Sequence, residues 1–380
     1  MKTLLKSFYL KIRSSALKAL SLFFIKKKSL PSLRDIQSIL FIRIDRVGDM
    51  VLSMPAFRAI KAALPNVRLT VMASLANAAI LKNNPDVNDV VIYDRLAGLH
   101  DKIKFLRKLR SQHFSLVIDP HNDYELKTAF LAALSGAANR IGYAAFGREI
   151  FFNHPPSVIK ENRPFVDVAL DLLQDIGISA TNRSPKVYIS EGEQDGAKKW
   201  TIQNDLQGKT IIGIHPGAHY ESQRWLPEYY AELIQLIRRQ PQTGIILFGG
   251  PADAKVIEEI ITRAKNEICV SIQDDLRNLS ALLAQCQIFI CNNSGPLHVA
   301  VALNIPTISF MGPTVKEQWT PIGAIHRVLR RDDLPCIGCN LGYCKIKTHE
   351  CMRLITPDEV AKMIFKDTYR THCTYKVRST

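Results

Sequence analysis

The chain has 380 residues, of which 47% are hydrophobic, and its 50 Lys and Arg residues outnumber its 35 Asp and Glu residues to give a net charge of +15. Because single hydrophobic cores stop growing near about 250–300 residues, this length predicts two domains. An excess of basic over acidic residues is typical of proteins that bind nucleic acid, membrane surfaces or acidic ligands. The sequence contains no nucleic-acid-binding module and no basic patch interleaved with aromatic residues, which excludes a nucleic-acid partner.

The first 34 residues form a basic segment with nine Lys and Arg residues and no acid. The longest apolar stretch in it, residues 19–25, is too short to cross a bilayer, and no signal-peptide cleavage site follows. Two interpretations remain open: a basic amphipathic helix that lies on an anionic membrane, or a helix that packs on the protein's own body. The apolar face of this helix would comprise Leu4, Leu5, Phe8, Ile12, Ala16, Ala19 and Phe23.

Residues 35–190 are predicted to form a first domain in which strands alternate with helices. Residues 39–44 are a β-branched apolar run typical of a strand buried on both faces, and residues 50–64 have helical periodicity. Such alternation predicts a parallel sheet. Further strands are expected at 67–73, 89–93, 114–118 and 140–143, and further helices at 75–82, 100–110, 126–134 and 163–175, before an interdomain passage at 178–193.

Asp49 ends the loop, residues 45–49, that follows the first strand. In an open α/β sheet, ligands bind at the carboxyl ends of the strands. The Asp49 carboxylate therefore has two interpretations. It caps the following helix by accepting backbone N–H bonds, or it is a general base that faces a ligand. The polar loop 119–123 follows another strand of the same domain.

Residues 191–356 are predicted to form a second domain with the same alternation, and residues 357–380 a C-terminal helix and tail. Several loops at the strand ends of this half contain glycine, which lets backbone amides approach a phosphate, and helix N-termini favour anions. We therefore expect the second domain to bind a nucleotide and the first domain to bind the other substrate. No GxGxxG or Walker sequence is present. Strands are expected at 210–214, 244–248, 288–291 and 306–310, and helices at 227–239, 254–265, 279–285 and 295–303.

An ordered set of motifs between about residues 39 and 364 resembles glycosyltransferase family nine, the heptosyltransferases of lipopolysaccharide core synthesis. One such motif alone is weak, but their joint order is specific. The motifs are Arg46-Val-Gly-Asp49 with Pro55; Val117-Ile-Asp119; Arg140-Ile-Gly-Tyr143; His215-Pro-Gly-Ala218 with Arg224-Trp225 and Pro227; Phe248-Gly-Gly-Pro251 with Asp253; Asn292-Asn-Ser-Gly-Pro-Leu-His298; and Gly312-Pro-Thr314.

The resemblance implies the glycosyltransferase B fold, in which two Rossmann-like domains face a cleft. It also implies inverting, metal-independent transfer of a heptose from a nucleotide sugar, usually ADP-heptose, to a lipopolysaccharide core or related glycolipid. Asp49 matches the position of the family's general base. No cofactor is implied. Such an acceptor would place the protein in the cytoplasm, peripherally on the inner face of the cytoplasmic membrane.

The resemblance also assigns donor residues in the second domain. Asp253 is similar in position to a residue that binds the nucleotide ribose. His298 resembles a residue near the phosphates, although a hydrogen-bonded core histidine is the alternative. The expected donor-binding residues are Gly217, Ala218, Arg224, Asp253, Asn293, Ser294, Gly295 and His298, and the expected acceptor-binding residues are Arg46, Asp119, His121 and Asn122.

Two positions depart from the family pattern. Asn293 stands where many members have an acid that contacts sugar hydroxyls, and Gln223 stands where they often have a lysine that neutralises phosphate. Arg224 follows directly, and arginine binds phosphate well. These departures leave two alternatives open: a nucleotide-sugar or glycolipid-binding protein without turnover, and a transferase for another sugar.

Four of the eight cysteines follow one another as Cys336-x2-Cys339-x4-Cys344-x6-Cys351. The first pair has zinc-ligand spacing, but the later gaps are irregular for a zinc ribbon. The loop 336–351 is a structural metal knot, a redox-sensitive loop or a reduced loop without a ligand, and we expect no metal and no catalytic role. A cytoplasmic location disfavours disulfides.

Overall fold

The computed structural model describes residues 8–17, 29, 31–154, 157–160, 162–265, 268–272 and 275–374. The chain divides into two compact units, Met1–Pro185 and Lys186–Thr380. The domain boundary expected between residues 190 and 191 falls a few residues after this division.

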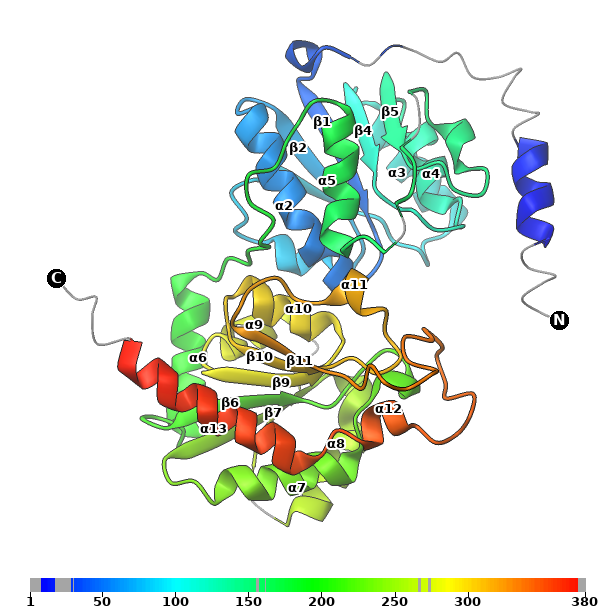
Figure 1. Ribbon diagram of the computed structural model, residues 1–380. Helices are drawn as coiled ribbons and strands as arrows, with labels where there is room; N and C mark the ends of the chain where they lie inside the picture. Colours follow the sequence, from blue (N-terminus) through cyan, green and yellow to red (C-terminus); the bar gives the residue numbers. More distant parts are fainter. Residues whose placement is uncertain are drawn as a thin grey trace. The chain divides into compact units, whose positions relative to one another are not determined.

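The first unit is built on a five-stranded sheet in the order β3-β2-β1-β4-β5, in which every pairing is parallel. The central strand β1 is buried along its whole length after Ser38, as its apolar, β-branched sequence predicts. The parallel α/β architecture expected for this half is confirmed (Figure 1). The strands are β1 Ser38–Arg43, β2 Arg68–Ala73, β3 Asp89–Ile92, β4 Leu116–Asp119 and β5 Asn139–Gly142.

The helices of the first unit follow the predicted pattern with two differences. Helix α2 begins at Val47, so Asp49 lies in its first turn and not in the loop before it. The helix expected at 75–82 is a single 3-10 turn, because the Asn77 side chain accepts a bond from Ser74 N and donates to the backbone of the β1 loop, which fixes a turn there. The elements are α2 Val47–Ala63, η2 Ala78–Leu81, α3 Leu99–Arg110, α4 Lys127–Leu134, η3 Arg148–Phe151 and α5 Phe165–Asp175.

The second unit contains a six-stranded parallel sheet in the order β11-β10-β9-β6-β7-β8. Its core packs around the fully buried ring of Trp225, whose centroid lies 4.6 Å from that of Phe310 and 4.8 Å from that of Tyr230. The parallel sheet expected for this half is likewise confirmed. The strands are β6 Thr210–His215, β7 Thr243–Gly249, β8 Cys269–Ile272, β9 Ile288–Asn292, β10 Thr307–Phe310 and β11 His326–Leu329.

Sequence reasoning missed both edge strands of this sheet, β8 and β11. Each has four residues, and neither is buried throughout, so neither shows the apolar run of a central strand. It also missed α6, which begins within the expected interdomain passage, where Ser190 and Glu193 form a capping box. The remaining elements are α6 Glu191–Gln203, η4 Glu221–Gln223, α7 Pro227–Arg238, η5 Pro251–Asp253, α8 Ala254–Ala264, α9 Leu276–Leu283, α10 Gly295–Ala302, α11 Lys316–Trp319, α12 Glu350–Arg353 and α13 Pro357–Thr374.

The basic N-terminal segment is described in part, and its residues 8–17 are helical. The guanidinium of Arg13 donates to the Tyr124 and Phe146 carbonyl oxygens at 2.6 and 2.9 Å, and Leu10 is buried. Phe8, Tyr9 and Ile12 are exposed. The described part of this helix therefore packs on the first unit and still presents apolar side chains to solvent. Residues 1–7 and 18–28, on which much of the predicted apolar face falls, lie outside the described residues.

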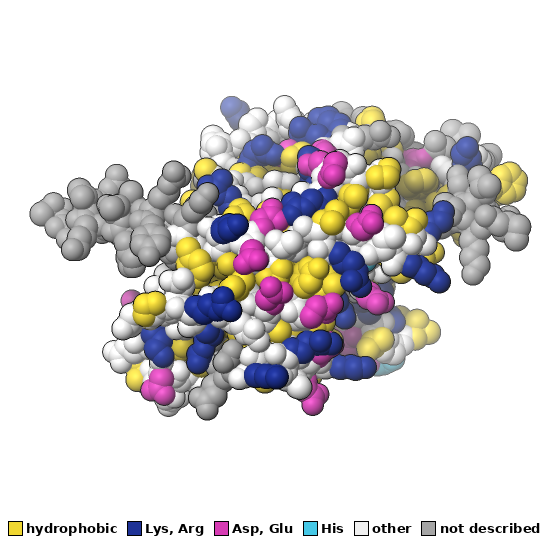
Figure 2. Space-filling view, turned by 60° about the horizontal axis from the view of Figure 1, so that its bottom comes forward, with side chains coloured by type: hydrophobic (Ala, Val, Ile, Leu, Met, Phe, Trp, Pro, Cys, Tyr) yellow, Lys and Arg dark blue, Asp and Glu magenta, His cyan; other side chains and the backbone are white. Residues whose placement is uncertain are grey.

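Charge is not segregated on the face shown in Figure 2, where basic, acidic and hydrophobic side chains are interspersed. Within the described residues, no helix combines the length and hydropathy needed to cross a membrane.

Candidate functional site

The chain of the first unit changes direction across its sheet between β1 and β4. Strands β2 and β3 lie on one side of β1, and β4 and β5 lie on the other. The carboxyl ends of strands that flank such a point are where ligands bind in open α/β sheets. Two acidic residues follow β1, namely Asp45 and Asp49, and β4 ends in Asp119, with His121 two residues later.

Asp49 is buried in the first turn of α2, where its Oδ2 accepts a hydrogen bond from Arg46 N at 3.2 Å. It therefore makes the type of bond that the helix-cap interpretation requires. Burial and the neighbouring Asp45 carboxylate raise the pKa of Asp49 to about 6. A carboxylate with this pKa is ionised near neutral pH and is also a strong enough base to accept a proton.

Asp45 differs from Asp49 in its partners. Its Oδ2 lies 3.0 Å from Arg43 Nη1 and 3.3 Å from His121 Nε2. Burial alone would raise the pKa of Asp45, but the Arg43 and His121 charges hold it well below its usual range. Asp45 and Asp49, the two acids that follow β1, thus have pKa values shifted in opposite directions, an arrangement that separates a permanent anion from a proton acceptor.

His121 lies between two carboxylates. Its Nδ1 is 2.7 Å from Asp119 Oδ1 on the side opposite Asp45. Burial alone would lower the pKa of His121, but the Asp45 and Asp119 charges outweigh it and raise the pKa to about 9. His121 is therefore cationic at neutral pH. Asp119 is completely buried, and its other oxygen accepts a hydrogen bond of 2.5 Å from Arg148 Nη2.

Arg43 fixes the other end of this group. It is buried in β1, donates from Nε to Ser53 Oγ at 3.0 Å, and stacks over the Phe165 ring with 5.5 Å to the ring centroid. Ser53 in turn donates to the Asp49 carbonyl oxygen at 2.8 Å. The same guanidinium thus holds Asp45 and, through Ser53, supports the first turn of α2 that carries Asp49.

The structure places Asp49 after β1, and Asp119 and His121 at the carboxyl end of β4, in the unit where sequence reasoning expected them, and it adds residues that sequence reasoning missed. The missed residues are Arg43, Asp45, Asn77 and Arg148. Arg43 gave the one usable signal, because it is a charge inside an otherwise apolar strand. Arg46 is exposed and Asn122 is half-buried, and their contact with an acceptor stays a prediction.

The second unit has an equivalent point between β6 and β9, and Asn292 joins the loops there. Its Nδ2 donates to Pro216 O at 2.7 Å, and its Oδ1 accepts from Trp225 N at 2.9 Å. Arg224, next to that tryptophan, donates to Ala218 O from two nitrogens at 3.0 and 3.2 Å. The loops after β6 and β9 are thus held together by side chains that contact backbone. Sequence reasoning did not assign this role to Asn292.

Asp253 closes the loop after β7. Its Oδ2 accepts from Gly250 N at 3.0 Å and lies 3.6 Å from His215 Nε2. Burial opposes ionisation, but these two partners hold the pKa of Asp253 below its usual value. A Cβ on Gly217 would lie 2.3 Å from Asp253 Oδ1, so the close approach of the two loops requires glycine. Gly217, His215 and Asp253 therefore form one compact group.

The N-terminus of α10 presents buried polar atoms that have no hydrogen-bond partner among the described residues: Asn293 Oδ1 and Ser294 Oγ. The Asn293 amide nitrogen donates to Thr314 Oγ1 at 3.3 Å, which points the orphaned oxygen away from that bond. A buried polar atom without a partner costs free energy unless a ligand or water satisfies it. His298 is buried on the same helix, and burial lowers its pKa to about 4, so the ring is neutral.

The cysteine loop 336–351 packs on two turns of this same region. Asn340 N donates to Pro313 O at 2.7 Å, and a Cβ on Gly312 would lie 2.8 Å from Cys351 Sγ. His349 Nε2 lies 2.9 Å from Ser222 O. The four cysteines are free thiols. Burial and the neighbouring thiols raise the pKa of Cys351 to about 11. Within the described residues, no three His, Cys, Asp or Glu side chains are arranged to hold a metal ion.

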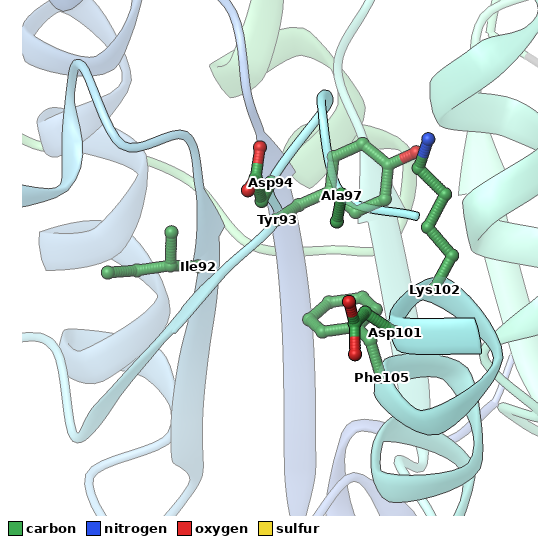
Figure 3. A pocket seen from close by; sticks show the side chains of 7 residues that line it. All are labelled: Ile92, Tyr93, Asp94, Ala97, Asp101, Lys102 and Phe105. Atoms are coloured by element: carbon green, nitrogen blue, oxygen red, sulfur yellow. The ribbon is translucent and has the colours of Figure 1, made fainter. Parts of the chain in front are cut away.

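A cavity of about 300 Å³ lies apart from these groups, between the end of β3 and the start of α3 (Figure 3). Tyr93 and Phe105 form its aromatic walls, in edge-to-face contact with 5.6 Å between centroids. Asp94, Asp101 and Lys102 are the charged residues that line it. None of the predicted site residues lines this cavity.

Comparison with known proteins points to one family. The model of glycosyltransferase family 9 (heptosyltransferase) matches residues 102–348. The lipooligosaccharide heptosyltransferase 2 of Haemophilus influenzae is 28% identical over 84% of this chain and 96% of its own length. The lipopolysaccharide heptosyltransferase 2 of Escherichia coli K12 is 27% identical over 83% of this chain and 93% of its own length. Among solved structures, an E. coli ADP-heptose lipopolysaccharide heptosyltransferase II has a TM-score of 0.74 at 25% identity, covering 88% of this chain and 99% of the other. A family 9 glycosyltransferase from Veillonella parvula has a TM-score of 0.77 at 22% identity, covering 88% and 97%.

The burial of Asp49 predicts a stability cost that depends on pH. A carboxyl whose pKa is higher in the folded than in the unfolded state loses folding free energy as it ionises, and the loss is complete above the folded-state pKa of about 6. We expect Asp49→Asn to raise the free energy of unfolding at pH 8 by about 1–3 kcal/mol, and therefore to raise Tm at that pH. The substitution should have little effect on either quantity near pH 4. Thermal unfolding at both pH values tests this, with exposed Asp35→Asn as the control. An unchanged or lower Tm at the higher pH would contradict it.

The packing of the cysteine loop predicts independence from metal. We expect thorough chelation to leave ligand binding, transfer activity and Tm unchanged, because the loop is held by hydrogen bonds to the backbone of residues 222 and 313. Metal analysis of the purified protein accompanies the assay. Stoichiometric zinc or iron, together with loss of activity on its removal, would overturn this prediction.

Proposed function

Because the chain belongs to glycosyltransferase family 9 and is a glycosyltransferase, we propose that it transfers a heptose from ADP-heptose to a lipopolysaccharide core or a related glycolipid. We further propose that the transfer is inverting and needs no metal. The two parallel α/β units match the fold of solved family members, the glycosyltransferase B fold.

The observation that carries the proposal is the pair of acids after β1. Asp49 combines a pKa of about 6 with a position at the carboxyl end of the central strand. Asp45 is held ionised by Arg43 and His121. Of the two, Asp49 is therefore the one whose proton affinity suits a general base at neutral pH.

In the proposed reaction, the acceptor hydroxyl oxygen forms a bond to the anomeric carbon while the bond from that carbon to the diphosphate oxygen breaks. Asp49 takes the hydroxyl proton. Attack from the face opposite the leaving group inverts the anomeric configuration. Asp45 keeps a negative charge beside Asp49, which makes Asp49 a stronger base than an isolated carboxylate. Asp119 acts on this site through His121, because both of its oxygens bind neighbouring side chains.

We assign donor binding to the second unit. The N-terminus of α10 offers a positive dipole end, and the Asn293 and Ser294 side-chain oxygens there lack partners among the described residues. These oxygens are suited to bond hydroxyl groups of a donor. The neutral His298 ring can donate one hydrogen bond to a phosphate oxygen. Asp253 is ionised and suited to accept bonds from ribose hydroxyls.

Arg224 and Asn293 bear on the alternative of a binding protein without turnover. The guanidinium of Arg224 already donates to Ala218 O, so the replacement of lysine by Gln223 is not compensated by an unengaged arginine. Asn293 cannot carry the charge that many relatives have at its position. A turnover assay with ADP-heptose and truncated core glycolipid separates transferase from binding protein, and a mass-spectrometric donor screen identifies the sugar.

We propose that the protein works in the cytoplasm, peripherally on the inner face of the cytoplasmic membrane. A glycolipid acceptor lies in a bilayer, and the N-terminal segment is strongly basic. The exposed Phe8, Tyr9 and Ile12 of helix 8–17 support contact with a lipid interface.

Replacing the base should remove most of the turnover. We expect Asp49→Asn to lower kcat by about 10²–10⁴-fold, since a positioned general base contributes that much. The kcat of the native protein should fall as the pH drops through about 6, because Asp49 then becomes protonated. Steady-state kinetics across pH measure both effects.

The control for this experiment is Asp35→Asn, an exposed acid before β1 that should keep native turnover. Circular dichroism establishes that both variants are folded. Near-native turnover of a folded Asp49→Asn variant would contradict the assignment of Asp49 as the base.

The donor site makes a separate prediction about ADP. A side chain at Gly295, the first residue of α10, should block the approach of a diphosphate to the helix N-terminus. We expect Gly295→Val to weaken ADP binding at least about tenfold by calorimetry. Gly196→Val on α6 is the matched control, because a Cβ there meets nothing within 4 Å. Equal ADP affinity of the two variants would count against the site.

A further inference from the structure

The segment between β3 and the second turn of α3, residues 92–103, exposes large apolar side chains. Leu96 is 94% exposed and Leu99 is 77% exposed. Ile92 and Ile103 are exposed as well. Single exposed leucines are ordinary, but a run of four exposed apolar side chains within twelve residues is typical of a surface that contacts something apolar.

The exposure is fixed by local structure. Leu96 N donates to Asp94 Oδ1 at 2.8 Å, and Gly98 caps the helix that begins with Leu99. On α3, Phe105, Leu106 and Leu109 pack into the core of the first unit. Leu99 and Ile103, one turn apart, remain outside this core. The cavity of Figure 3 lies between the start of α3 and the end of β3, and side chains of this segment, among them Ile92, Asp101 and Lys102, line it.

Basic side chains surround these leucines. Residues 94–110 contain six Lys and Arg residues and two Asp residues. Arg95 and Lys104 are exposed, and no ion pair among the described residues involves them. Lys127 lies over the Tyr93 ring, 5.1 Å from its centroid, and adds a further positive charge. Exposed apolar side chains surrounded by basic side chains are complementary to the interface of an anionic bilayer.

A chain of contacts links this segment to the N-terminal helix. Lys127, which lies over Tyr93, begins α4, and the loop just before α4 carries the exposed Tyr124. The carbonyl oxygen of that same Tyr124 accepts the hydrogen bond from Arg13 of helix 8–17. The exposed Phe8, Tyr9 and Ile12 are therefore attached to the loop that follows β4, next to the segment 92–103 that follows β3.

We propose that residues 92–103 form a membrane-docking surface, in which Leu96 and Leu99 insert into the interface of anionic phospholipids while Arg95, Lys102 and Lys104 contact their phosphates. The inference rests on the proposed function, because an enzyme that acts on a glycolipid must reach the bilayer. A second copy of the chain is a poor occupant, since two such surfaces would bring like charges together.

The test measures binding of the full chain to vesicles of phosphatidylglycerol and phosphatidylethanolamine. We expect the double variant Leu96→Ser/Leu99→Ser to weaken binding about tenfold, because two apolar side chains no longer leave water. Arg95→Gln/Lys104→Gln should weaken binding and reduce its salt dependence. In a separate variant, Leu96→Trp, the fluorescence of the introduced indole should be quenched by brominated lipid. The chain's own Trp200, Trp225 and Trp319 all lie in the second unit.

The matched control is Ile202→Ser, a half-exposed apolar residue on α6 of the second unit, which should bind vesicles as the native chain does. Removal of residues 1–28 separates the contribution of the N-terminal helix. Unchanged vesicle binding by the double leucine variant, or no lipid quenching in the Leu96→Trp variant beyond that of the native chain, overturns the proposal. So does a concentration-dependent dimer in sedimentation that the leucine substitutions abolish, because the surface would then belong to a second copy.

The result of the vesicle-binding test does not depend on which sugar the protein transfers. Transfer to a soluble, delipidated acceptor should be unchanged in the leucine variant, so failure of the docking surface and failure of the proposed transfer reaction give different results. A leucine variant that loses transfer to the soluble acceptor would place these residues in substrate binding and contradict membrane docking.

Discussion

A chain of alternating charges, buried except for the partly exposed Asp45, organises the first unit. Arg43, Asp45, His121, Asp119 and Arg148 contact one another in that order, at distances between 2.5 and 3.3 Å. The chain joins the ends of β1 and β4 to the turn at Arg148. Removing one member of a buried ion pair typically costs about 3–5 kcal/mol, because the remaining charge is left without its partner. The geometry at the carboxyl ends of β1 and β4 therefore depends on all five residues together. These residues also determine the position of the proposed base, Asp49.

Asp49 lies beside this chain and not within it. Its carboxylate accepts a hydrogen bond from the Arg46 backbone N–H, while the nearby arginines bind the other two acids: Arg43 binds Asp45, and Arg148 binds Asp119. This difference in partners explains why two acids four residues apart have pKa values shifted in opposite directions. It also means that the helix-cap and general-base interpretations of Asp49 do not exclude each other. One oxygen supports the first turn of α2, and the group as a whole keeps a proton affinity suited to catalysis.

The corresponding loops of the second unit are held mainly by bonds from side chains to the backbone. Asn292 uses both ends of its amide to hold the loops that follow β6 and β9, and Gly217 allows Asp253 to approach at a distance that any side chain would prevent. The cysteine loop adds contacts to the backbone of residues 222 and 313, so it braces this region by packing.

Local sequence patterns were sufficient to predict the alternation of strands and helices, the two sheets, and most of the residues at their carboxyl ends. Apolar runs mark the buried strands, and Gly or Asp follows them. Edge strands β8 and β11 were not predicted because they are short and partly exposed. The prediction of a helix at 75–82 was wrong because the Asn77 side chain bonds backbone at the end of β1, a contact between residues far apart in sequence. The partners of Arg43, Asp45 and Arg148, in contrast, are visible only in the folded structure, although Arg43 stood out in the sequence as a charge inside an apolar strand. Folding places Asp45 against His121 and Arg148 against Asp119, partners that are distant in the chain; Arg148 and Asp119 are 29 residues apart. A pKa depends on such surroundings in space and not on the neighbouring letters.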